Sequence, residues 1–170
     1  MSKAVSQIRV LGREVPAIVR AEELFDQTNR LSEEIARRAY ELFDQRGRVQ
    51  GLDLHDWLQA ESELLQPVPV EIVETADKIK VRAEVPGFTA DELQLSVEPL
   101  WLVIAGRMDP RSEKPAGAAY SERRSKRICK VIDLPVEVQT TRAEFELQDG
   151  VLELALPISF RSLRSETLTA

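Results

Sequence analysis

The apolar residues of this 170-residue chain change their spacing once, at residues 66–69, and this change limits the folds open to it. Before that point apolar side chains recur every three or four positions, which predicts amphipathic helices; beyond it they alternate with polar residues, which predicts half-buried strands. The intervening sequence Gln-Pro-Val-Pro disfavours helix, because proline lacks an amide donor and biases its predecessor toward extended backbone. We therefore predict a helical N-terminal arm over residues 1–66, a β domain over residues 67–157 and a flexible tail over residues 158–170.

The arm is predicted to hold a long helix over about residues 17–46 and a second over about 54–65. The apolar spacing of the first begins at Ile18, and Gly47 can close the helix in the left-handed conformation. Asp53 is placed to cap the second helix.

Within the long helix the sequence Leu-Phe-Asp-Gln occurs at residues 24–27 and again at 42–45. The offset is five full turns at about 3.6 residues per turn, so both copies face the same way. The repeat indicates either two equivalent adhesive contacts on one helix face or the reuse of good helix formers around core residues. Residues 31–65 also resemble a short bacterial helical module of unknown function, which brings no activity with it.

The second half of the chain predicts seven or eight short antiparallel strands. Turn-forming pairs separate them, and Asp149-Gly150 is a strong hairpin signal. Short strands separated by such turns predict a mainly β fold, an immunoglobulin-like antiparallel β-sandwich. The alternating apolar positions include Ile79, Val81, Ala83, Val85, Leu93, Leu95, Val97, Leu100, Leu102, Ile104, Leu152, Leu154 and Leu156.

Composition excludes several classes of protein. No apolar run approaches the ~20 residues that cross a bilayer, and the N-terminus lacks a secretory signal, so we expect a cytoplasmic protein that does not enter membranes. A single cysteine allows no internal disulfide, and a net charge of −6 disfavours nucleic acid as a partner.

No catalytic or cofactor site emerges from the residues. With His55 as the only histidine, neither a Ser-His-Asp triad nor a histidine-rich metal site can be assembled, and Asp53 and Asp56 beside it fit a helix start. Cys129 is expected to be structural. The basic run at residues 123–130 lacks interleaved aromatic residues and is expected to form a solvated strand face with ion pairs between subunits. We expect a protein that is not an enzyme and needs no cofactor.

Several β-domain segments, in order, resemble the alpha-crystallin domain of the small heat-shock proteins. They are residues 70–88, which include a Pro-Gly-Phe turn, Ile-Ala-Gly-Arg at 104–107, Leu-Pro at 134–135 and Gly-Val-Leu-Glu-Leu-Ala-Leu-Pro at 150–157. The resemblance implies an ATP-independent holdase chaperone, a stress-response protein that binds unfolding proteins and suppresses their aggregation. The alternative is a co-chaperone or scaffold that uses the same sandwich for one protein partner.

The resemblance also implies a homodimer. In bacterial and plant relatives a loop such as residues 108–119 carries a strand that pairs with the first strand of the neighbour. Residues around Tyr120 would then meet Val70 and Ile72 of the other copy. Lys130 stands where the family commonly has an arginine, which keeps the charge but loses bidentate pairing. Phe145 stands where the family usually has alanine.

The tail lacks the Ile-x-Ile or Ile-x-Val segment that ties dimers of the family into larger oligomers. Ile8 and Val10 offer the same alternation near the N-terminus, and we hypothesise that they dock between residues 93–97 and 145–147. Unfolded clients are expected on the apolar helix faces and on this groove. The residues expected to bind clients or line the groove are Leu24, Phe25, Leu42, Phe43, Leu93, Leu95, Val97, Phe145 and Leu147.

Overall fold

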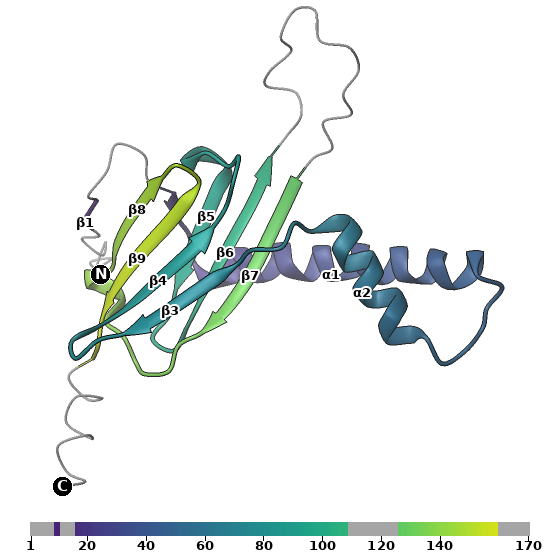
Figure 1. Ribbon diagram of the computed structural model, residues 1–170, viewed down its shortest axis with the longest axis horizontal. Coiled ribbons are helices and arrows are strands. Elements are labelled where there is room, and N and C mark those ends of the chain that lie inside the picture. The colour runs from purple at the N-terminus through teal and green to yellow at the C-terminus, as the bar shows by residue number, and fades with distance from the viewer. Residues whose placement is uncertain (1–8, 11–15, 109–125, 160–170) are drawn as a thin grey trace, which may run out of the picture.

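Two β-sheets face each other in the computed structural model, which describes residues 9–10, 16–108 and 126–159 (Figure 1). Sheet A has the strand order β1-β8-β9-β4-β3, and sheet B has the order β2-β5-β6-β7. All pairs within β3 to β9 are antiparallel, whereas the short strands β1 and β2 join their sheets in parallel. The predicted β-sandwich with a helical N-terminal region is confirmed. The strands are β1 (Arg9–Val10), β2 (Ala17–Ile18), β3 (Val70–Glu74), β4 (Lys78–Glu84), β5 (Leu93–Val97), β6 (Trp101–Met108), β7 (Lys126–Asp133), β8 (Glu144–Gln148) and β9 (Val151–Pro157).

Alternating side chains fill the space between the sheets. In β4 every second residue is buried while its neighbours face solvent. The same period in the other strands builds one apolar core, because successive side chains of a strand point to opposite faces. That core includes Ile79, Val81, Ala83, Val85, Leu93, Leu95, Leu102, Ile104, Ile128, Ile132, Phe145, Leu152, Leu154 and Leu156.

Glycine is required at the turn between β8 and β9. Asp149 and Gly150 both have positive φ, at 51° and 75°, as a two-residue hairpin loop of the primed type demands. A Cβ atom at Gly150 would lie 3.1 Å from the Cα of Pro86, so this turn also packs closely against another loop.

A hairpin of two helices precedes the sandwich: α1 (Ala21–Gln45) and α2 (Asp53–Leu64). Its own small core consists of Leu31, Ile35 and Ala60. Residues 17 and 18, expected in the long helix, instead form β2 beside β5, where the amide of Val19 donates to the carbonyl of Leu95 at 2.9 Å. These residues pair with the edge of β5 instead of continuing the helix.

Helix α1 runs across the face of sheet B that points away from sheet A and then extends past β7, where α2 packs on it (Figure 1). Asp53, expected as the cap of α2, is its first helical residue; the N-cap position is Leu52, and no side chain in the described parts of the chain caps this end. Neither α1 nor α2, the two α-helices among the described residues, combines the length and apolar character needed to span a bilayer.

Candidate protein-binding site

The edges of the two sheets differ on the two sides of the sandwich. On one side the N-terminal segment of the chain covers both edges: β1 pairs with β8, and β2 pairs with β5. On the other side, within the described ranges, β3 and β7 have no strand beyond them. An open edge presents unpaired amide and carbonyl groups to any chain that can add a strand.

Strand β3 combines its open edge with exposed apolar side chains. Ile72 is 40% exposed and Val73 is 46% exposed, whereas Val70 is half-buried against the sandwich core. Lys130 lies on β7 with its side chain in solvent, opposite Ile104 of β6. Tyr120, the residue expected to meet β3 of another copy, lies outside the described residues.

The groove expected between β5 and β8 is not an open apolar surface. Leu93, Leu95 and Phe145 are buried in the sandwich core, while Val97 and Leu147 are only partly buried. The sequence period correctly places these side chains on the inner face, but it cannot tell whether that face is accessible at the sheet edge. The assignment of Leu93, Leu95 and Phe145 to a freely accessible client surface was therefore wrong.

The chain's own N-terminal segment lies along these edges. Val10 is opposite Phe145 in the parallel register of β1 and β8, and Ile18 is opposite Leu95 in that of β2 and β5. Pro16, just before β2, is fully buried. Ile8, the other half of the expected docking pair, lies outside the described residues.

Polar contacts fix α1 to the outer face of sheet B. The guanidinium of Arg127 in β7 lies 2.7 Å from the carboxylate of Glu34, and the amide of Gln27 donates to Gln94 at 3.0 Å. A cleft of about 680 Å³ remains between helix and sheet beside these contacts. Arg127 was expected to make ion pairs between subunits, yet here it pairs within its own chain.

Cys129 lies beneath α1. Its sulfur is 3.9 Å from the hydroxyl oxygen of Thr28, and it packs beside the apolar core of the hairpin. Burial raises the pKa of the Cys129 thiol above its ordinary value, and the hydrogen bond with Thr28 offsets part of that rise. A protonated, half-buried thiol is a poor nucleophile, so the geometry favours the structural role expected for this residue.

The two copies of Leu-Phe-Asp-Gln meet different surroundings. Leu24 is 1% exposed, so it is not accessible to a client and that expectation was wrong, whereas Leu42 is partly buried against the hairpin core. Phe25 is 65% exposed. Phe43 is half-buried, and its ring centroid lies 6.1 Å from that of Tyr40. The two copies lie on the same face of α1 but differ in exposure, because the sandwich covers one end of α1 and α2 packs on the other.

An ion pair that the residue patterns did not reveal closes the hairpin. The guanidinium of Arg46 makes two hydrogen bonds to the carboxylate of Asp56, at 2.5 and 2.6 Å, and Asp56 is almost completely buried. These hydrogen bonds raise the pKa of Arg46 above its ordinary value. A buried carboxylate needs such a partner, because an unpaired buried charge is strongly unfavourable. His55 beside it is exposed, and the described residues contain no group of three or more side chains placed to hold a metal.

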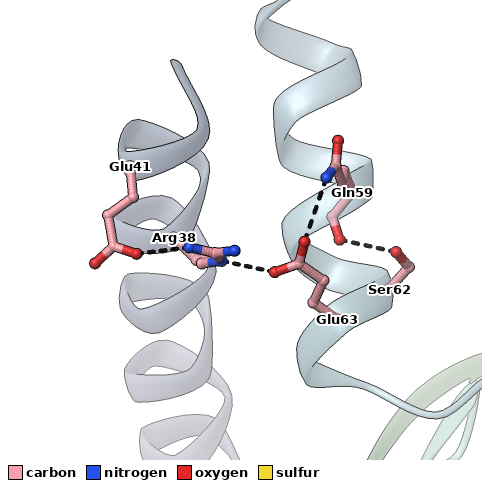
Figure 2. Close-up of polar contacts among 5 residues, drawn as sticks. All are labelled: Arg38, Glu41, Gln59, Ser62 and Glu63. Carbon is pink, nitrogen blue, oxygen red and sulfur yellow. Dashed lines mark hydrogen bonds and ion pairs between the residues drawn. The ribbon is translucent and has the colours of Figure 1, made fainter. Parts of the chain in front are cut away.

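A second set of polar contacts joins the two helices nearer the sandwich (Figure 2). Arg38 of α1 lies between Glu41, at 2.9 Å on its own helix, and Glu63, at 2.6 Å on α2. Figure 2 also shows Gln59 donating to Glu63, and the hydroxyl of Ser62 donating to the carbonyl of Gln59. The guanidinium of Arg38 thus bridges α1 and α2.

Two protein families match adjoining parts of the chain. The Hsp20/alpha crystallin family matches residues 71–166, more than half of the chain, and this range spans almost all of the sandwich from β3 to β9. A family of unknown function, DUF2934, matches residues 30–66, the part that holds most of α1 and all of α2.

Individual relatives match the same β region. Small heat shock protein OV25-2 of Onchocerca volvulus is 41% identical over 86 residues, 50% of this chain and 49% of that protein. The chloroplastic small heat shock protein of Pisum sativum is 30% identical over 90 residues, 53% of this chain and 38% of the relative. The chain thus spans half or less of the length of these relatives. Among solved structures, heat shock protein 16.0 from Schizosaccharomyces pombe is similar with 26% identity and a TM-score of 0.47, over 55% of this chain and 87% of that one.

Proposed function

Because the chain belongs to the Hsp20/alpha crystallin family, we propose that it is an ATP-independent holdase chaperone that binds unfolding proteins and suppresses their aggregation. The match of that family to residues 71–166 is the observation that carries the proposal. Membership implies a chaperone role in general, and the holdase mechanism is the specific form we infer for this chain. We place the protein in the cytoplasm, with the division into arm, sandwich and tail at residues 66–67 and 157–158.

Exposed apolar side chains supply the surface for clients. Phe25 is 65% exposed near the start of α1, and Tyr40 is 60% exposed farther along the same helix. An unfolding client buries apolar area by binding such side chains, which is favourable by about 25 cal/mol for each Å² removed from water. Binding to the unfolded state lowers the concentration of free unfolded protein and so slows aggregation without consuming ATP.

Self-association supplies the second element of the mechanism. We infer that strand β3 of one copy receives a strand from the other, which brings residues around Tyr120 to Val70 and Ile72. The open edge of β3 and the 40% exposure of Ile72 support this arrangement. We assign Lys130 on β7 to the same interface, and the exposure of this residue supports the assignment.

Docking of the N-terminal segment between β5 and β8 completes the proposal. Backbone pairing of Val10 with Phe145 supports a role for Ile8 and Val10 in holding the segment there. Release of this segment would uncover the edge of β8 and the partly buried Leu147, and so give clients a further apolar edge.

Light scattering from a heated client protein tests the proposal. We expect scattering to fall when the chain is added without nucleotide, and to fall less for Phe25→Asp. Leu100→Asp is the matched control, because Leu100 is also exposed, at 54%, but lies outside the proposed client surface. Undiminished scattering at a molar excess of the wild-type chain would contradict the holdase mechanism. A monomeric native mass together with binding to one partner protein would favour a scaffold instead.

A further inference from the structure

Three arginines line the cleft between α1 and the outer face of sheet B. Arg30 comes from α1, Arg107 from β6 and Arg127 from β7. Arg107 and Arg127 are directly opposite each other in the β6–β7 register, so both side chains project from the same face of the sheet. Like charges in such a pair repel each other, because the two Cβ atoms lie about 4.5–5.5 Å apart. The strand pairing therefore brings together cations that need anionic partners.

One of these three guanidinium groups has an anionic partner within the chain. Arg127 pairs with the carboxylate of Glu34 at 2.7 Å. Among the described residues, no ion pair or side-chain hydrogen bond includes Arg30 or Arg107, and both residues are exposed. A guanidinium group carries five N–H donors in a fixed plane. The helix and the sheet thus each present one unengaged guanidinium group to the cleft.

The carboxylates of the cleft are as many as its arginines, but most of them already have a donor. Glu34 accepts from Arg127, and Glu92 accepts a hydrogen bond from the amide of Thr89 at 2.9 Å. Asp91 is the remaining carboxylate among the lining residues. The donors of two arginines therefore exceed the acceptors that the cleft itself has to offer.

Small and polar side chains shape the rest of the cleft. Ala105 lies between Gln94 of β5 and Cys129 of β7 in the strand register, and its short side chain leaves room beneath α1. Gln27 and Thr28 line the cleft from the helix. The volume of about 680 Å³ lies within the range of roughly 300–1,000 Å³ that is typical of small-molecule sites. Amide and hydroxyl groups in the lining suit a ligand that carries hydroxyl groups of its own.

We propose that this cleft binds a small phosphate monoester with a hydroxyl-bearing body, and that Arg107 and Arg30 hold the phosphate from the sheet and from the helix. A phosphate group has acceptor oxygens on several sides and carries up to two charges, so it accepts from two guanidinium groups at once. A carboxylate has two oxygens in one plane and one charge, which a single guanidinium group satisfies. The site lies apart from Phe25 and from the edge of β3, so it goes beyond the proposed chaperone function.

Calorimetric titration tests the class of ligand. Glucose 6-phosphate, gluconate and glucose have similar hydroxyl-bearing bodies and differ in their charged group. We expect glucose 6-phosphate to bind saturably at millimolar concentrations or below, at least about 10-fold more tightly than gluconate, because a second charged hydrogen-bonding group contributes. Glucose should show no saturable binding. No saturable binding of glucose 6-phosphate, or equal affinities for glucose 6-phosphate and gluconate, would overturn the proposal.

Arginine variants and the single cysteine test the place of binding. Arg107→Gln should weaken the binding of glucose 6-phosphate by about 10- to 100-fold, the effect of losing hydrogen bonds between charged groups, and unchanged circular dichroism shows that the variant is folded. Arg142→Gln is the matched control, because Arg142 is also exposed but does not line the cleft. Saturating glucose 6-phosphate should slow the alkylation of Cys129 by iodoacetamide several-fold, since this residue lines the cleft and is the only cysteine. Equal affinities of the wild-type and Arg107→Gln chains, or binding that leaves the alkylation rate unchanged, would refute this site.

Discussion

Phe145 provides a quantitative test of how the sandwich is held together. Its side chain is 1% exposed in β8, opposite Leu154 of β9, within the core between the sheets. Phe145→Ala removes a fully buried aromatic ring and leaves a cavity, which costs about 3–5 kcal/mol. Because a domain of this size is stable by about 5–15 kcal/mol, we expect the variant to lose at least a fifth of its free energy of unfolding.

Urea denaturation followed by tryptophan fluorescence measures this loss. The chain has two tryptophans, and a Trp57→Phe background leaves Trp101 of β6 as a probe of the sandwich alone. Phe25→Ala is the matched control, since its ring is 65% exposed and its removal should cost less than about 0.5 kcal/mol. Both variants are compared at one protomer concentration, because self-association shifts apparent stability. A loss below about 1 kcal/mol for Phe145→Ala, or equal losses for the two variants, would refute the assignment of Phe145 to the core.

Three further predictions concern single contacts. Burial raises the pKa of Cys129, so the folded chain holds the thiol proton more tightly than the unfolded chain does. The free energy of unfolding should therefore fall as pH rises above about 8.5. Cys129→Ala should remove this contribution to the pH dependence of unfolding. Asp56→Ala should lower the melting temperature of the helical signal by about 5 °C or more, whereas Asp53→Ala, at an exposed site on the same helix, should leave it nearly unchanged. Gly150→Ala should destabilise the sandwich by about 1–2 kcal/mol through its positive φ and by more through contact with Pro86; in denaturant titrations Gly51→Ala, with positive φ and open space, should show only the first effect.

The sandwich could be predicted from sequence because its signals are local. Alternation of apolar and polar residues, as in β4, indicates the backbone conformation of the residues within a few positions, and so do turn residues such as Asp149-Gly150. The start of α1 could not be predicted in the same way. Ile18 fits the helical spacing, but an edge of β5 far along the chain offers it strand pairing instead.

Exposure at the candidate site depends on contacts that a periodic pattern does not contain. Leu24 and Phe25 are neighbours in sequence, and only the placement of α1 on sheet B makes one buried and the other exposed. The pairing of Arg46 with Asp56 crosses the turn of the hairpin, so no helical or strand spacing indicates it. Leu95 was correctly placed on an inner face, yet the strand that lies beside it comes from the N-terminal segment.

Native mass spectrometry of the chain heated with an unfolding client tests whether the chain binds unfolding proteins. We expect soluble complexes whose masses combine several copies of this chain with client, formed without nucleotide and absent when the client is left folded. If the chain and the client kept separate masses after heating, with the client lost to the precipitate, the chain would not be a holdase.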